Sequence, residues 1–66
     1  MNYLLEALCA KLEGEIAVGK ANVMVYQRNS AGIGEHSDIV ESIETQIAKI
    51  AEAEDKLETI KKHFKN

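Results

Sequence analysis

The 66-residue sequence predicts an all-α protein, an antiparallel hairpin of two long helices with coiled-coil-like packing. Three observations lead to this prediction: proline is absent, turn-forming residues gather in one short segment, and apolar residues on both sides of that segment recur at helical spacing. We expect helices over residues 2–29 and 38–64 and a loop over residues 30–37, with residues 1–66 forming one unit. Similar helix lengths around a short loop favour antiparallel packing.

The first predicted helix carries two apolar stripes on nearly opposite sides. The first stripe consists of Leu5, Leu8, Leu12, Ile16, Gly19, Val23 and Tyr26. The second stripe consists mainly of small residues, namely Ala7, Ala10, Gly14, Ala17 and Ala21. Tyr3, Val18 and Val25 lie on the second stripe or beside it.

Small residues let two helix backbones approach closely, and the helix-interior glycines Gly14 and Gly19 each cost up to about 1 kcal/mol relative to alanine unless a packing contact offsets that cost. The second helix of the same chain can cover only one of the two stripes on the first helix. We therefore expect the first helix to lie at the centre of an oligomer, with the small-residue stripe as its interface with another copy. The alternative is that these alanines face solvent because alanine is a good helix former.

The loop, residues 30–37, contains Gly32 and Gly34 and leads into the start of the second helix. The glycines are suited to the left-handed backbone that ends a helix and turns the chain. The alternative is an anion site, because N–H groups at a helix start bind anions, although the lysine-serine pair of a P-loop is missing. The candidate ligand-binding residues are Lys20, Tyr26, Arg28, Gly32, Gly34, His36 and Ser37.

The second predicted helix, residues 38–64, begins after a capping residue, Ser37 or Asp38. Its predicted coiled-coil seam consists of Val40, Ile43, Ile47, Ile50, Leu57 and Phe64. Ile39, Ala53 and Ile60 widen this stripe, whereas Glu54 and Lys61 interrupt it. We expect Glu54 either to pair with Lys11 of the first helix and fix the register, or to remain solvated.

A hairpin this short buries little apolar surface, and it needs a disulfide, a metal or further copies for stability. The single cysteine, Cys9, excludes an intrachain disulfide, and His36 and His63 are not accompanied by a cysteine pair at zinc-ligand spacing. We therefore predict no metal or cofactor and expect a homo-oligomer. A two-fold dimer forming a four-helix bundle is the simplest, and a trimer or larger ring stays open.

The residue pattern predicts a protein without enzymatic activity. His36, beside Glu35 and Asp38, has no nucleophile nearby, and the pair of Cys9 and His63 lacks a third orienting group. A net charge of −3 makes nucleic acid an unfavourable partner. The N-terminal apolar run is too short for a secretion signal or a membrane span, which predicts a cytoplasmic protein without a membrane partner. Two functions remain, a self-associating interaction protein and an oligomeric module that binds an anionic small molecule such as a nucleotide.

Three segments, residues 21–29, the loop motif GIGEHSDI at residues 32–39, and residues 47–57, resemble small uncharacterised helical proteins of tailed bacteriophages, including marine ones. The similarity covers about residues 20–64. Those proteins often have proline where Ser37 stands, and a first-turn position accepts both. The resemblance implies a phage origin, the host cytoplasm as location, an accessory role and a phage or host protein partner. Phage proteins that sequester host signalling nucleotides provide the precedent for the nucleotide-binding alternative.

Overall fold

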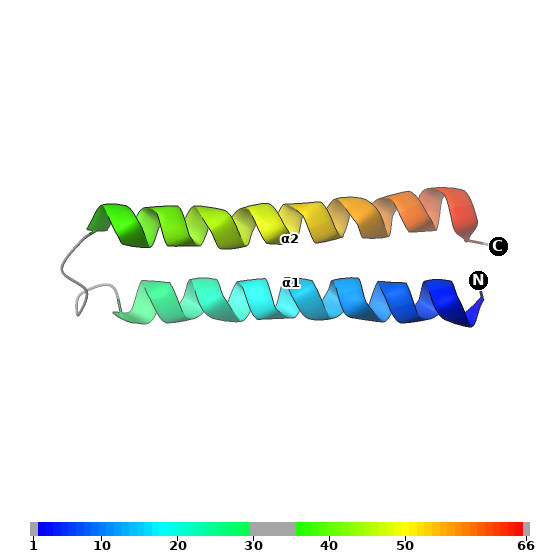
Figure 1. The fold of residues 1–66 in the computed structure, drawn as a ribbon, viewed down its shortest axis with the longest axis horizontal. Helices are drawn as coiled ribbons and strands as arrows, with labels where there is room; N and C mark the ends of the chain where they lie inside the picture. The colour runs from blue at the N-terminus through cyan, green and yellow to red at the C-terminus, as the bar shows by residue number, and fades with distance from the viewer. Residues whose placement is uncertain (1, 30–35, 66) are drawn as a thin grey trace.

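The protein is an antiparallel pair of long helices in the computed structural model, which describes residues 2–29 and 36–65, with side chains for residues 2–28 and 38–65. Helix α1 (Tyr3–Asn29) and helix α2 (His36–Phe64) lie side by side in a rod of 50 × 15 × 12 Å (Figure 1). The start of α1 and the end of α2 lie at the same end of the rod. The predicted all-α hairpin is therefore confirmed.

Asn2 caps the first turn of α1. Its side-chain oxygen accepts a hydrogen bond from the backbone N–H of Leu5 at 2.9 Å, and its carbonyl accepts one from Glu6 N–H at 3.0 Å. Glu6 also places a negative charge near the positive end of the helix dipole. Asparagine is among the best residues for this position, which explains why the helix begins directly after it.

The second helix begins at His36, earlier than the predicted residue 38. Ser37 and Asp38 therefore lie inside the first turn. The side chain of Ser37 lies outside the described residues, so the predicted cap stays a prediction. Asp38 still contributes negative charge to the first turn, and Lys61 and Lys62 contribute positive charge to the last turn. Negative charge at the start of a helix and positive charge at its end both interact favourably with the helix dipole.

The inner face of α1, which is the side that packs against α2, matches the first predicted stripe, except that Cys9 replaces Leu8. Leu12 is buried to 2% exposure and forms the centre of the core, and Gly19 is also buried. Leu8 is more exposed than predicted, because the half-buried Cys9 takes the position that faces the core. The other half-buried members of this face are Leu5, Ile16, Val23 and Tyr26.

The predicted seam of α2 is wrong at three of its six positions. The buried or half-buried residues are Ile39, Ile43, Gln46, Ile50, Ala53, Leu57 and Ile60. Val40 and Ile47 instead lie 64% and 53% exposed, and Phe64 at the end of the helix is also exposed. The predicted seam and the observed seam overlap, and both contain Ile43, Ile50 and Leu57. The chain adopts the one that keeps Glu54 and Lys61 in water, because burying these charges without partners is costly.

Gln46 is the polar residue of the buried seam, at 9% exposure. Its side-chain oxygen accepts a hydrogen bond from the amide Nδ2 of Asn22 on α1 at 3.0 Å. This cross-helix bond penalises a shift of one helix along the other, since a shifted Gln46 would lose its partner. Of the two alternatives for Glu54, the solvated carboxylate is observed, because Glu54 is exposed and Lys11 pairs with Glu15 on its own helix.

Candidate functional site

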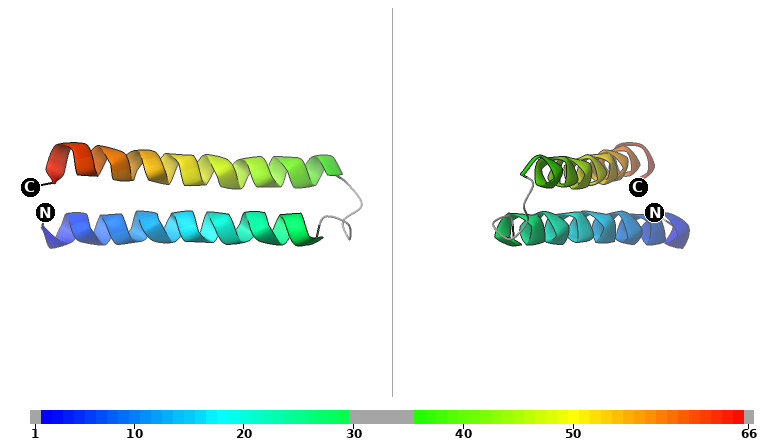
Figure 2. Two further views of the ribbon diagram at one scale, coloured as in Figure 1. Left: turned by 180° about the vertical axis from the view of Figure 1, so that it is seen from behind. Right: turned by 60° about the vertical axis from the view of Figure 1, so that its left-hand side comes forward.

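The outer face of α1, the side turned away from α2, is apolar and uncovered within the chain. It contains the predicted interface residues Ala7, Ala10, Gly14, Ala17 and Ala21, all of which are exposed. Figures 1 and 2 show α2 running along one side of α1 only, so no other described segment reaches this face. The sequence-based expectation that a single hairpin leaves the small-residue stripe open is confirmed for the described residues.

Larger apolar side chains border the small residues and are strongly exposed. Tyr3 is 78% exposed, Val18 is 60% exposed, and Leu4, Met24 and Val25 are also open to solvent. Together with the five small residues they form a continuous apolar strip, which we call the outer strip, along most of α1. Met24 was missing from the predicted stripe, although its spacing from Ala17 and Ala21 matches the same side of the helix. Contiguous exposed apolar surface of this kind is typical of an interaction site.

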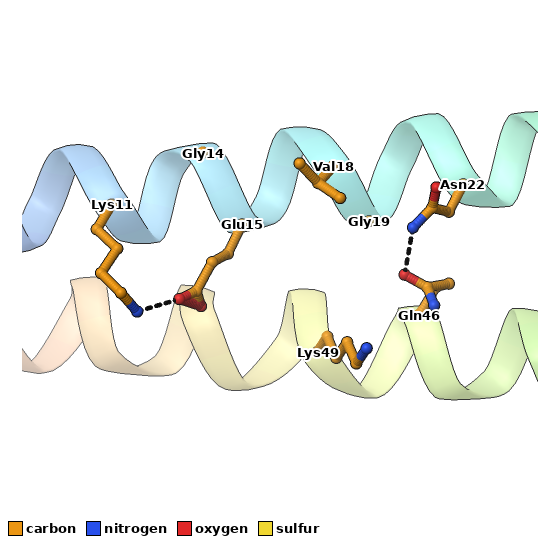
Figure 3. A pocket seen from close by; sticks show the side chains of 8 residues that line it. All are labelled: Lys11, Gly14, Glu15, Val18, Gly19, Asn22, Gln46 and Lys49. Carbon is orange, nitrogen blue, oxygen red and sulfur yellow. Dashed lines mark hydrogen bonds and ion pairs between the residues drawn. The ribbon is translucent and has the colours of Figure 1, made fainter.

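The two glycines of α1 lie in different environments: Gly14 is on the side of the helix turned away from α2, and Gly19 is on the side that faces it (Figure 3). A Cβ atom added at Gly19 would lie only 2.6 Å from Ile50 Cγ1 and 3.0 Å from Ile50 Cδ1, so the absence of a side chain allows α1 and α2 to pack closely. At Gly14 an added Cβ would meet nothing within 4 Å. Packing inside the hairpin therefore accounts for Gly19 and not for Gly14.

A shallow groove of about 650 Å³ runs beside the outer strip, between α1 and α2. Its lining residues are Lys11, Gly14, Glu15, Val18, Gly19, Asn22, Gln46 and Lys49 (Figure 3). The polar groups within it already bind one another, since Lys11 pairs with Glu15 and Asn22 donates to Gln46. The groove thus has few polar groups left to hold a ligand, and it widens the apolar surface next to Val18.

The charged residues that line the groove are two lysines, Lys11 and Lys49, and one glutamate, Glu15. The hydrogen bond from Lys11 lowers the pKa of Glu15 below its ordinary value of 4.5, and the positive charge of Lys56 on α2 acts in the same direction. Both carboxylate and ammonium remain in water, so this pair contributes little to stability.

The structure describes the side chains of three of the residues predicted to bind an anionic ligand. Lys20 and Arg28 are exposed, whereas Tyr26 is half-buried on the side of α1 that faces α2. Gly32 and Gly34 lie outside the described residues, as do the side chains of His36 and Ser37. The nucleotide-binding alternative stays a prediction that no described contact supports.

The described residues contain no cluster of three or more histidine, cysteine, aspartate or glutamate side chains suited to a metal ion. Within the same residues, neither helix has a stretch apolar and long enough to cross a membrane. Cys9 lies half-buried in the helix interface and His63 is exposed in the last turn of α2.

Comparisons with protein-family models, with curated proteins and with solved structures found no match to this chain. The expected relationship to proteins of tailed bacteriophages stays a prediction.

Proposed function

We propose that the protein is a non-enzymatic, self-associating helical hairpin that acts by protein-protein interaction, with the outer strip of α1 as its interface with a second copy. The single observation that carries the proposal is Gly14, an exposed glycine in a helix interior with open space where a side chain would be. Such a glycine weakens the helix by up to about 1 kcal/mol unless close contact with another backbone offsets the loss.

The distribution of apolar residues around the two helices supports the same conclusion. They are spread more evenly around α1, whereas those of α2 gather more strongly on the side that packs against α1. A helix that is apolar on two sides is suited to burial between two neighbours. We propose a two-fold dimer with the two copies of α1 at its centre and α2 on the outside.

The resemblance to phage proteins suggests a phage or host protein as the further partner, in the cytoplasm of an infected cell. Affinity purification from infected cells, followed by mass spectrometry of proteins and small molecules, tests this part. A co-purifying protein at fixed stoichiometry is the expected result, and recovery of a bound nucleotide would favour the alternative function.

Self-association is tested by light scattering after size-exclusion chromatography. We expect the wild-type chain to have the mass of a dimer at micromolar concentration, and Ala17→Glu to have the mass of a monomer with most of its helix content. The matched control is Ala48→Glu, which makes the same change at an exposed position on α2 and should remain dimeric. A monomeric, fully helical wild type would overturn the proposal.

A further inference from the structure

Charged residues border the outer strip, and their order along α1 is suited to an antiparallel pair. Glu13 and Lys20 are exposed and lie one heptad apart, so they occupy the same edge of the strip. Within the described residues, neither takes part in an ion pair. Opposite charges placed in this way face each other when a second copy of the helix runs in the opposite direction.

We infer that two copies pair through their outer strips with α1 antiparallel to α1, so that Glu13 of each copy faces Lys20 of the other. The inference rests on the proposed self-association and adds its orientation and register. The two-fold axis then crosses α1 between Gly14 and Ala17, and each contact occurs twice. Facing layers pair Gly14 with Ala17, Ala10 with Ala21, and Ala7 with Met24 of the second copy.

This register also gives the ends of the strip a partner. Arg28 is exposed and lies on the same side of α1 as the small residues, as does Tyr3 near the other end of the helix. In the antiparallel pair, the guanidinium of Arg28 lies next to the ring of Tyr3 in the second copy. A cation over an aromatic face is a favourable contact, and it would cover the most exposed aromatic side chain of the described residues.

The alternative arrangements bring like charges together. Sliding one α1 by a heptad of seven residues sets Glu13 against Glu13 or Lys20 against Lys20, depending on the direction. A parallel pair could set Glu6 against Lys11, but it places Arg28 against Arg28 within the strip and aligns the two helix dipoles. The antiparallel register is the one that combines full overlap of the strip with opposite charges at its edge.

Disulfide cross-linking tests orientation and register together. In a Cys9→Ala background, one variant carries Ala10→Cys and another carries Ala21→Cys. Mixed and oxidised, they should form a disulfide-linked heterodimer, because residues 10 and 21 face each other across the proposed pair. Each variant alone should not cross-link, since its two cysteines would be about 16 Å apart along the helix axis, too far for a disulfide.

Each other outcome has a defined meaning. Cross-linking of each variant with itself would indicate a parallel pair and overturn the inference, while the proposed self-association would stand. Dimers by mass that cross-link in no mixture would overturn the proposed register. Monomers by mass in the wild type would overturn the proposed function itself. Circular dichroism of each variant confirms that the helices are retained.

Charge-reversal variants provide a second test, and they change only residues that are exposed in the single chain. Glu13→Lys and Lys20→Glu should each weaken dimerisation about tenfold, because two attractive pairs become repulsive. An equimolar mixture of the two variants should form a heterodimer with affinity near that of the wild type, since every Lys then faces a Glu. Glu41→Lys on the outside of α2 is the control and should change nothing. Failure of the mixture to regain affinity would contradict the register.

Discussion

Gly14 and Gly19 are close neighbours in the middle of α1, and each removes a side chain from a helix that would be more stable with alanine. At Gly19 the reason lies inside the hairpin, because Ile50 of α2 occupies the space that a methyl group would need. At Gly14 nothing lies within 4 Å. One side of α1 is therefore shaped by its own second helix, whereas the opposite side has open space at Gly14, where we propose that a second copy packs.

The largest effect should come from the inner side. Leu12→Ala removes the most deeply buried large side chain, at 2% exposure, and should lower the free energy of unfolding by about 2–5 kcal/mol. Chemical denaturation followed by circular dichroism measures this change. Leu8→Ala makes the same substitution one helical turn away at a more exposed position and should cost far less. Equal losses for the two variants would mean that the inner side is not as described.

Gly19→Ala should destabilise the hairpin by about 1–3 kcal/mol, because the new methyl group clashes with Ile50. A gain of up to about 1 kcal/mol in helix propensity offsets part of this loss. Combining Gly19→Ala with Ile50→Ala removes the clashing atoms, and the two changes together should cost less than the sum of their separate effects. A double-mutant cycle by urea unfolding measures this coupling. If the two changes in the free energy of unfolding add strictly, contact with Ile50 does not explain the glycine at position 19.

Gly14→Ala should behave in the opposite way. In the monomeric Ala17→Glu background it should raise the free energy of unfolding by up to about 1 kcal/mol, since the new methyl group meets open space. In the wild-type background, at concentrations where the dimer predominates, the same change should gain less or become unfavourable, because the methyl group then presses on the second copy. The same gain in both backgrounds would argue that the outer strip remains open.

The smallest effect concerns pH and the solvent-exposed pair of Lys11 and Glu15. The folded pKa of Glu15 lies below its ordinary value of 4.5, so the contribution of the carboxylate is present above pH 4.5 and is lost as the pH falls through the lowered pKa. Glu15→Gln should therefore be slightly less stable than the wild type at neutral pH and equal to it in strong acid. Thermal unfolding at a series of pH values checks the difference.

The fold could be predicted from the sequence because a single cluster of turn formers separates two long segments with helical periodicity. The exact seam of α2 could not, since Ile39 and Val40 are adjacent apolar residues that begin two overlapping heptad patterns. Packing against α1 decides between them, with Ala53 and not Glu54 facing inward. Gln46 was overlooked for the same reason, because its role depends on which pattern is buried.

The outer strip was predictable in composition and less so in extent. Alanines at helical spacing identified its centre, whereas Met24 lies beyond the small residues and was not recognised as part of it. Asn22 gave no periodic signal, and its bond to Gln46 follows from the way the two helices align. Of the predicted ligand residues on α1, Lys20 and Arg28 are exposed and Tyr26 is half-buried, and the anion site stays a prediction.

The most direct test of a covered outer strip is the dependence of the thermal unfolding midpoint on protein concentration. A dimer held together through this strip unfolds at a higher temperature as the concentration rises, because association stabilises the folded state by mass action. We expect a clear rise over a hundredfold range for the wild type and a constant, lower midpoint for Ala17→Glu. A wild-type midpoint that does not change with concentration and equals that of Ala17→Glu would contradict the proposal that a second copy covers the outer strip.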